Sequence, residues 1–405
     1  MTGHTHRVLV VGGGVAGLET ALALRSLAPG LVDVEILAPE HHFWYRPLAV
    51  AEPFGLGTAG SFELADLAAE AGALFTPGAL ERVDTARKVA VATHGVELEY
   101  DSLVIAAGAR PEPALRGALT FRGPADSDTF RSLLRAAASG LVERIAFALP
   151  AGAVWPLPLY ELALMTARQL REVPGADTSL AFVTHEQRPL ALFGPAASEA
   201  VEQLLGELGV YVFTGRYPVA VTPEGLTVVP GETIAADRVV SLPRLVGPAF
   251  QGLPSDSAGF VPADEHGRVL GFEDVYACGD ASAFPVKQGG IAAQQADAVA
   301  QAIAAAAGAE VEPRPFRPVL RGLLLTGQTP QYLRTELSGG RGPALADPDP
   351  LWWPPAKIVG RYLTPFLAER GIREPEPPES GFAVEIELDT DRKESSCNAL
   401  PSSPS

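Results

Sequence analysis

The feature that most constrains the fold is a glycine-rich turn between an apolar run and a helix pattern near the N-terminus. Residues 7–11 are typical of a buried strand, residues 16–27 of a helix and residues 33–38 of a second strand. A strand, a tight turn, a helix and a strand within about 30 residues predict a β-α-β unit with parallel strands. The chain is therefore expected to contain a Rossmann-like α/β domain that holds a nucleotide.

The turn itself has the spacing of a dinucleotide-binding fingerprint. Gly12, Gly14 and Gly17 stand at the GxGxxG positions. The first permits the tight turn, the second lets a pyrophosphate approach the backbone, and the third lets the helix pack on the strand. Val15 and Ala16, at the start of the helix, are expected to face the phosphates, because free N–H groups and the helix dipole favour anions there. NAD, FAD and S-adenosylmethionine domains all use such a turn, so it does not identify the nucleotide.

The acid that usually follows the second strand is displaced. About 20 residues after the turn, a carboxylate at the end of this strand normally binds ribose hydroxyls. Ala38 occupies that position, and Glu40, two residues later, is the candidate substitute. A solvated loop carboxylate remains the alternative for Glu40.

The later patterns predict a second nucleotide-binding-like domain inserted in the first. After a hairpin pattern in KVAVAT and VELEY and the strand SLVIAAG, a new series begins near Glu143, with helices over 157–170 and 196–208. A hairpin of LTVVP with ADRVVSL closes it, and DVYACGD and an alanine-rich helix return to the first domain. The expected class is α/β, with two Rossmann-like, three-layer ββα domains and a C-terminal appendage. The expected boundaries are 1–118 and 246–312 for the first domain, 119–245 for the second, 313–373 for the appendage and 374–405 for a disordered acidic tail.

Composition excludes several classes of partner. The 405 residues are 47% hydrophobic and 20% charged, and the formal net charge is −17. An acidic surface repels a phosphate backbone, so nucleic acid is not expected as a partner. No apolar run reaches the roughly 18 residues that span a bilayer, and the N-terminus leads straight into a strand, so a cytoplasmic protein is expected. Two cysteines, Cys278 and Cys397, and histidines without HExxH-like pairing predict neither a disulfide framework nor a metal site.

Two further stretches carry a resemblance to a known family. YDSLVIAAGARP and DVYACGDASAFP are apolar strand patterns that end in small residues and a glycine. The order GGGxxG, AAGxxP and YACGD resembles the two-dinucleotide-binding-domain flavoproteins, which are related to the pyridine nucleotide-disulfide oxidoreductases. The resemblance covers roughly residues 7–370 and implies FAD as the cofactor. It places Ala107 and Gly108 across the FAD, and Gly279 and Asp280 against its ribityl chain and phosphates.

The stretch KQGGIAAQQAD is similar to sulfide:quinone oxidoreductases and type II NADH dehydrogenases. Two glycines open a helix whose first amides are expected to be free, and the partial positive charge there suits the anion of a reduced flavin. The resemblance implies backbone contacts of Gly290 and Ile291 with the flavin pyrimidine ring. It also brings Lys287 and Arg46 near the flavin, with a surface lysine and an ordinary ion pair as the alternatives.

The second domain departs from the pattern of NADH-using relatives. Where a second GxGxxG is expected, PAGAVWPLPLYELALM holds one glycine, and Trp155, Pro156 and Pro158 remove space and N–H groups. The stretch resembles the Cys-x-x-Pro-x-Tyr-Glu segment of sulfide:quinone oxidoreductases, but Trp155 stands at the cysteine position and the second redox cysteine is also missing. The standard sulfide mechanism needs a thiolate and is not expected here. Glu161 is the candidate proton-handling acid facing the flavin, and a helix-surface carboxylate is the alternative.

The stretch WWPPAKIVGRYLTPFLAERG resembles the membrane-binding helices of quinone reductases. Its apolar residues fall on one helical face, and Lys357, Arg361 and Arg370 on the other suit anionic lipids. Packing on the protein itself is the alternative. Peripheral contact of residues 351–370 with the inner face of the cell membrane, and a homodimer, are further expectations.

Together these features predict an FAD-dependent oxidoreductase. It is expected to take electrons from a small-molecule donor and to pass them through the flavin to a quinone or a protein acceptor. Two alternatives stay open. One is an NAD(P)H-dependent flavin reductase with an atypical nicotinamide site, and the other is a non-catalytic FAD-binding redox sensor in which Trp155 fills the substrate cavity.

Overall fold

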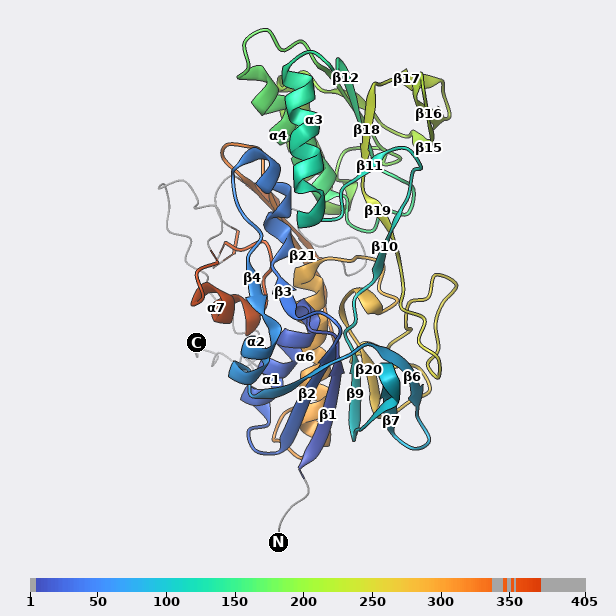
Figure 1. Ribbon diagram of the computed structural model, residues 1–405. Helices are drawn as coiled ribbons and strands as arrows, with labels where there is room; N and C mark the ends of the chain where they lie inside the picture. Colours follow the sequence, from blue (N-terminus) through green and yellow to red (C-terminus); the bar gives the residue numbers. More distant parts are fainter. Residues whose placement is uncertain (1–4, 337–344, 348–350, 353–354, 373–405) are drawn as a thin grey trace, which may run out of the picture.

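The computed structural model describes residues 5–336, 345–347, 351–352 and 355–372. Its first unit is a five-stranded parallel sheet in the order β20-β9-β1-β2-β5 (Figure 1). In the central strand, Val8 pairs with Val34 on one side and Ser102 on the other. The strands are β1 (His6–Val11), β2 (Val32–Ala38), β5 (Ala73–Pro77), β9 (Ser102–Ile105) and β20 (Val275–Ala277). Because the strands of the second sheet come between β9 and β20 in the chain, the first unit is interrupted as the sequence predicts.

Different layers cover the two faces of this first sheet. On one face, α1 (Val15–Leu27) and α6 (Gly289–Ala306) pack together over Val8, Val10 and Val104. The alternate side chains of the same strands face an antiparallel sheet, which explains the period of two along them. This sheet consists of β6 (Leu80–Asp84), β7 (Val89–Ala92) and β8 (Val96–Glu99), so the predicted hairpin of KVAVAT with VELEY is confirmed.

The second unit repeats this three-layer plan. Its parallel sheet has the order β11-β18-β12-β13-β14. Phe147 and Phe182 pack against helices on one face, and Ala146 and Val183 pack against an antiparallel sheet on the other. The strands are β11 (Leu119–Thr120), β12 (Arg144–Ala148), β13 (Ser179–Val183), β14 (Tyr211–Phe213) and β18 (Arg238–Ser241). The helices are α3 (Ser127–Ala138), α4 (Leu157–Arg171) and α5 (Pro195–Glu207), and the outer sheet is β15 (Tyr217–Thr222), β16 (Gly225–Val229) and β17 (Thr233–Ala235).

The hairpin expected from LTVVP and ADRVVSL is wrong. The strand β16 pairs with β15 and β17, whereas β18 joins the parallel sheet beside β12. Val239 and Val240 in β18 point to opposite faces of a sheet covered on both sides, and both are buried. An apolar run of this kind is typical of a buried parallel strand and not of a surface hairpin.

A short antiparallel ribbon carries the chain between the two units. It pairs β10 (Arg110–Pro113), on the way to the second sheet, with β19 (Pro243–Val246), on the way back. Figure 1 shows this ribbon between the two sheets.

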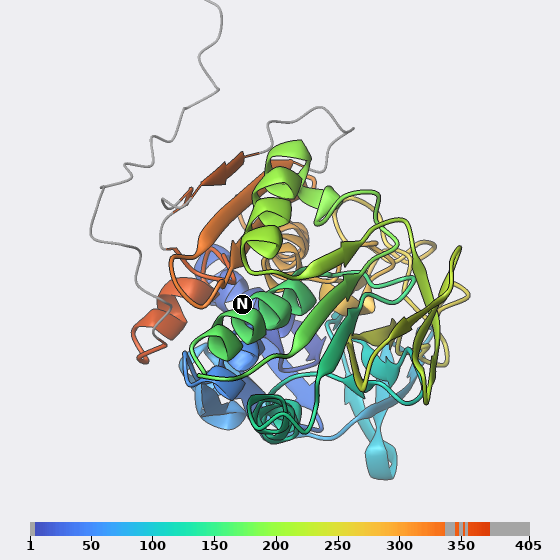
Figure 2. The same cartoon turned by 90° about the horizontal axis from the view of Figure 1, so that it is seen from above.

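The C-terminal residues add a third, smaller layer. The strands β21 (Val319–Leu324), β22 (Gln331–Glu336) and β23 (Leu345–Asp347) form an antiparallel sheet. Figure 2 shows these orange strands beside the green helices of the second unit, in agreement with the contacts of α4 and α5 with this sheet. Near the N-terminal unit, β3 (His42–Trp44) pairs with β4 (Ser61–Glu63), followed by α2 (Leu64–Glu70).

The long amphipathic helix expected within residues 351–370 is much shorter. Among the described residues of this range, only Leu363–Ala368 are helical, and they form α7. Ile358, Leu363 and Leu367 are buried in the core of the first unit, and Lys357 is buried as well. These side chains cover the protein itself and are not available to lipid. Among the described residues, no helix has the length and apolar character needed to cross a bilayer. The expected disordered tail, with Cys397, lies outside the described residues.

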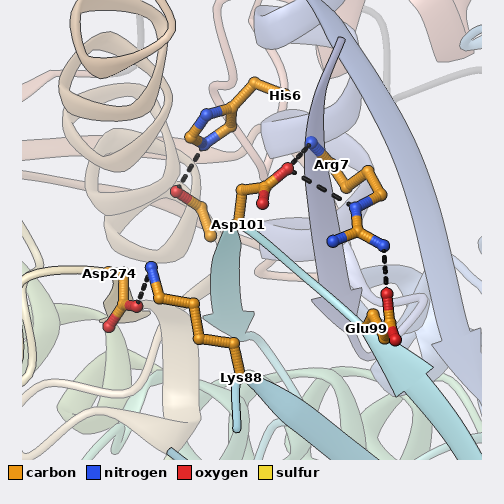
Figure 3. Close-up of polar contacts among 7 residues, drawn as sticks. His6, Arg7, Lys88, Glu99, Asp101 and Asp274 are labelled. Atoms are coloured by element: carbon orange, nitrogen blue, oxygen red, sulfur yellow. Dashed lines mark hydrogen bonds and ion pairs between the residues drawn. The ribbon is translucent and has the colours of Figure 1, made fainter. Parts of the chain in front are cut away.

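Ion pairs join the first sheet at the edge where its strands begin. Arg7 pairs with Glu99 at 2.7 Å and with Asp101 at 3.5 Å, and Lys88 pairs with Asp274 at 2.6 Å (Figure 3). These contacts link β1 to β8 and to the start of β9, and the turn before β7 to the start of β20. Because the side chains are partly exposed, each pair is expected to stabilise the fold by only about 0–1 kcal/mol. The opposite edge of the sheet, where the strands end, carries the residues described next.

Candidate functional site

The glycine turn after β1 is shaped by two different demands. Gly12 has a φ of 115°, and an added Cβ would overlap the carbonyl oxygen of Ala106. A Cβ on Gly17 would overlap the carbonyl oxygen of Gly12. Gly14, in contrast, is exposed, and a Cβ there would meet no heavy atom within 4 Å. The chain's own packing thus requires Gly12 and Gly17, and the space beside Gly14 is open.

The first amides of α1 face this open space without a side-chain cap. The cap residue is Gly14, which offers no acceptor to the helix start. Val15 is half-buried and Ala16 is buried at this end of the helix. A helix N-terminus without an internal acceptor favours an anion such as a pyrophosphate.

The structure brings the three sequence motifs together at one edge of the first sheet. The strands β1, β9 and β20 are parallel neighbours and end side by side, at Gly12, at Ala107 and Gly108, and at Gly279 and Asp280. Ala107 is exposed, and Gly108 has a φ of 70° with no heavy atom within 4 Å of an added Cβ. The Gly279 amide donates to the side chain of Gln295 in α6 at 2.8 Å, which fixes the turn that carries Asp280.

Two cations lie close to Asp280. Burial raises the pKa of Asp280, and the charges of Lys287 and Arg46 oppose that rise. Lys287 is itself buried, donates to the carbonyl of Ser282 and lies 4.0 Å from the centre of the Phe260 ring. Burial lowers the pKa of Lys287 to about 8, against the opposing charges of Asp280 and Asp256. Lys287 is therefore not a surface lysine, and Asp280, Lys287 and Arg46 form one electrostatic group.

The start of α6 corrects one expectation. Gln288 is the cap residue, and its Oε1 accepts from the Ile291 amide at 2.9 Å. The prediction that the first amides of this helix are free is therefore wrong for Ile291. This bond does not involve Gly290, whose contact with a cofactor stays a prediction.

Glu161 forms a buried ion pair that was not predicted, either by its interpretation as an acid facing the flavin or by its interpretation as a helix-surface carboxylate. Its side chain is 1% exposed, so a helix-surface carboxylate is wrong. Oε1 accepts from Lys357 Nζ at 2.6 Å and from the Leu325 amide at 2.8 Å. The carbonyl of Lys357 accepts from Gln288 Nε2 at 3.4 Å, which places this pair beside the N-terminus of α6.

The corresponding turn of the second unit, after β12, is filled by the protein's own side chains. Trp155 packs edge-on against Phe193 at 5.9 Å between ring centres. Pro156 is the cap residue of α4, which also has a proline in its first turn. A pyrophosphate would meet an indole ring here and would find fewer N–H donors.

The carboxylate that follows β13 is also occupied. Glu186 accepts from the Tyr160 hydroxyl at 2.6 Å, from the Thr184 hydroxyl at 3.0 Å and from the Ala191 amide at 3.1 Å. Burial, together with Glu186, raises the pKa of Tyr160 well above its usual value. Glu186 thus holds its own loop and α4 instead of offering an acceptor to a ribose.

The remaining candidates lie apart from these groups. Glu40 is an exposed loop residue beyond β2, and its contact with a ribose stays a prediction. Cys278 is fully buried, and burial raises the pKa of its thiol to about 12, so it is not available as a thiolate. His42 pairs with Glu63 at 2.9 Å. Within the described part of the chain, no group of His, Cys, Asp and Glu side chains has the arrangement of a metal site.

Comparisons with known proteins agree with this arrangement. Residues 6–141 match the family described as pyridine nucleotide-disulphide oxidoreductase. An NADH dehydrogenase-like protein of Mycobacterium tuberculosis is 31% identical over 307 residues, which cover 68% of this chain and 73% of the relative. The chain belongs to the pyridine nucleotide-disulphide oxidoreductase family.

Solved structures with the same fold extend the similarity over most of the chain. The sulfide:quinone oxidoreductase of Aquifex aeolicus has a TM-score of 0.74 and 19% identity, over 85% of this chain and 87% of the other. A ferredoxin reductase from Rhodopseudomonas palustris has a TM-score of 0.65 and 19% identity, over 83% of each chain. NDH2 of Plasmodium falciparum in complex with NADH has a TM-score of 0.56 and 16% identity, over 69% of this chain and 65% of the other. These likenesses concern the fold, which is the predicted pair of Rossmann-like domains.

Members of this family are FAD-dependent flavoproteins, and FAD is the cofactor of this chain. The residues at the edge of the first sheet fit the group. The space beside Gly14 and Gly108 suits a pyrophosphate and a flavin that approach the backbone. Asp280 supplies an acceptor for hydroxyl groups, and Lys287 and Arg46 supply positive charge.

Sequence reasoning missed the roles of three residues of this region. Gln288 and Lys357 gave no signal by spacing, and Lys357 lies 196 residues from its partner Glu161. Glu186 had a signal that was not used, since it follows the second strand of its own β-α-β unit much as Glu40 follows β2. A search for the ribose acid in both units would have found it.

Proposed function

We propose that this FAD-dependent oxidoreductase passes electrons from a small-molecule donor through its flavin to a quinone. The observation that carries the proposal is the buried pair of Glu161 and Lys357 beside the N-terminus of α6. Reduction of a quinone takes up two protons with two electrons, so it benefits from a protonatable group that is held away from bulk water. Glu161 is such a group and is kept in place by two donors.

The residues of the first unit have binding and electrostatic roles in this proposal. When bound, FAD supplies the redox chemistry, and the protein supplies orientation and electrostatics. Gly12, Gly14 and Gly17 shape the pyrophosphate site, and Asp280 binds the sugar alcohol. Lys287 places positive charge near the ring, while the buried pair of Glu161 and Lys357 supplies a proton to the acceptor. A role of Glu161 beside the ring is supported by its link to α6 through Lys357 and Gln288.

The second unit argues against a nicotinamide nucleotide bound in the standard way. Its turn after β12 holds Trp155 against Phe193, and its candidate ribose acid Glu186 is bonded to Tyr160 and Thr184. A donor that binds elsewhere, near the flavin, is therefore favoured over NADH or NADPH.

The charge of the chain favours a quinone over an acidic carrier protein as the acceptor. The formal net charge is −17, and like charges slow the association of two proteins and weaken their complex. A neutral quinone is not subject to this repulsion.

The test is the oxidative half-reaction. The FAD-loaded protein is photoreduced without oxygen and mixed in a stopped-flow instrument with a short-chain quinone, and flavin absorbance is followed. We expect reoxidation that is much faster than that of free reduced FAD and is slowed at least tenfold in the double variant Glu161→Gln/Lys357→Met. The double variant is used because removal of one partner leaves an unpaired buried charge, which destabilises by about 3–5 kcal/mol. If the quinone reoxidises the protein-bound flavin no faster than it reoxidises free reduced FAD, the proposal is contradicted.

A second candidate is an NAD(P)H-dependent reductase, because the 31% identical relative is named NADH dehydrogenase-like. Anaerobic mixing of the oxidised protein with NADH or NADPH separates the two. Rapid bleaching of the flavin would support the reductase, and unchanged flavin absorbance would exclude both nucleotides as donors.

A further inference from the structure

The side chain of Gln288 joins three parts of the chain at the start of α6. Its Oε1 accepts from the amide of Ile291, the third residue of the helix, at 2.9 Å. Its Nε2 donates to the carbonyl of Arg321 in β21 at 3.3 Å and to the carbonyl of Lys357 at 3.4 Å. The residue is 7% exposed, so these bonds are made in the interior. Gln288 thus fixes α6 against β21 and against the segment that carries the partner of Glu161.

The chemistry of this cap is unusual for a helix start. Ser, Thr, Asp and Asn are the common caps, and a carboxylate is favoured there because it interacts with the positive end of the helix dipole. Glutamine supplies the same acceptor oxygen without a charge. The field at the start of α6 therefore comes from the helix and from Lys287, and the cap does not neutralise it.

We propose that Gln288 is a positioning residue that sets the reduction potential of the flavin. By capping α6 with a neutral group, it keeps the positive end of the helix available to the negative charge that reduction places on the flavin. Its two bonds to Arg321 and Lys357 hold that end at a constant distance. The proposal rests on the proposed function, in which Lys287, the neighbour of Gln288, lies near the flavin ring and so brings the ring to the N-terminus of α6.

The experiment compares two substitutions that add the same charge to the same helix. Gln288→Glu places a carboxylate at the cap, and Gln301→Glu places one near the other end, about 20 Å away at 1.5 Å per residue. Gln301 resembles Gln288 in that its side chain accepts one backbone amide, that of Arg314 at 3.1 Å. Midpoint potentials of the FAD-loaded proteins are measured from pH 6 to 9 by slow enzymatic reduction in the presence of a reference dye.

We expect the potential of Gln288→Glu to be more negative than that of the wild type, by an amount that grows with pH as the introduced carboxylate ionises. The variant Gln301→Glu is expected to retain the wild-type potential. Gln288→Asn, which keeps a neutral cap with a shorter reach, is expected to retain most of it. An unchanged potential in Gln288→Glu with full FAD occupancy would overturn the proposal, and so would equal shifts in the variants at 288 and 301.

Failure of the ring placement gives a different result. The potential is measured at equilibrium with a chemical reductant, so it does not depend on the natural donor or acceptor. Lys287→Gln removes one of the two cations that interact with Asp280 and is expected to make the potential more negative as well. A shift in Lys287→Gln without one in Gln288→Glu would leave the ring placement intact and refute the role of Gln288. The absence of a shift in both would refute the placement itself and the proposal with it.

If Gln288→Glu does not fold, its melting temperature will reveal this, and Gln288→Met, which removes the cap without adding charge, takes its place. A wild-type potential in Gln288→Met would contradict the proposal.

Discussion

The turns after β1 and β12 have the same position in their β-α-β units, but the first is open and the second is filled by side chains. In the first, Gly12 and Gly17 permit the close packing of the turn, Gly14 leaves open space at the start of α1, and the carboxylate of Asp280 interacts with two cations. In the second, Trp155 and Phe193 fill the corresponding place, and Glu186 is bonded within its own loop. The same β-α-β geometry therefore provides a nucleotide site in one unit and a packed core in the other. Binding capacity depends on what the turn leaves empty and not on the fold alone.

The largest expected effect is on stability, when one glycine in each of the two turns is replaced by alanine. In Gly12→Ala the new Cβ overlaps the Ala106 carbonyl at a φ of 115°, so both strain and overlap destabilise the fold, by about 3 kcal/mol or more. Gly152 has a φ of 79° but no heavy atom within 4 Å, so Gly152→Ala is expected to destabilise by only about 1 kcal/mol. Urea unfolding at a fixed concentration of free FAD measures both values. Equal losses in the two variants would show that the two turns are under the same packing demand.

The second prediction compares two carboxylates. Asp280→Ala removes an acceptor from the cofactor edge and is expected to weaken FAD binding by roughly 10- to 100-fold, from the 1.5–3 kcal/mol typical of a hydrogen bond to a charged group. Glu186→Ala removes three bonds within the second unit and is expected to lower stability by about 1–3 kcal/mol, with FAD content unchanged. The flavin-to-protein absorbance ratio after gel filtration reports binding, and urea unfolding reports stability. Full FAD occupancy in Asp280→Ala would refute its role, and loss of FAD in Glu186→Ala would refute the separation of the two units.

The sequence predicted the first turn well because its constraints are local. The spacing of Gly12, Gly14 and Gly17 follows from backbone geometry that any chain of this topology must satisfy. The ends of β9 and β20 were assigned to the cofactor by the resemblance of their motifs to a flavoprotein family, and the parallel order of β20, β9 and β1 brings these ends to one edge. The predicted hairpin of LTVVP with ADRVVSL was wrong because a short apolar run does not reveal which neighbour it will pair with.

The contacts that sequence reasoning missed are long-range. Glu161 and Lys357 meet across 196 residues, and Gln288 meets the carbonyl of Lys357 across 69. The expected helix around Lys357 was too long because its apolar residues have a helical spacing, whereas residues 355–362 follow an irregular path with bends and turns over the first unit. Tertiary packing overrides local periodicity when a segment covers an existing core.

The smallest expected effect concerns a second pair of carboxyl groups, in the helices of the first unit. Glu19 in α1 accepts from the amides of Tyr362 at 2.9 Å and Leu363 at 2.6 Å, so it fastens α7 to the first unit. Burial, followed by the charge of Asp297 in α6, raises the pKa of Glu19 to about 8. Burial raises the pKa of Asp297 to about 6, with Arg361 opposing the rise. The pair is therefore expected to hold one proton near neutral pH.

The sign of the pH dependence follows from these raised values. The folded state binds more protons than the unfolded state between about pH 4 and pH 8, so the free energy of unfolding falls as pH rises through this window. Asp297→Asn removes one titrating group and its repulsion, so we expect a flatter dependence and a gain in stability relative to the wild type at pH 8. Urea unfolding at pH 5.5 and pH 8 measures the difference, with Asp128→Asn on the exposed face of α3 as the control. If the free energy of unfolding of both variants depends on pH as that of the wild type does, Glu19 and Asp297 do not share a proton. In that case α7 is held only by the hydrogen bonds from the backbone amides to Glu19 and by apolar packing.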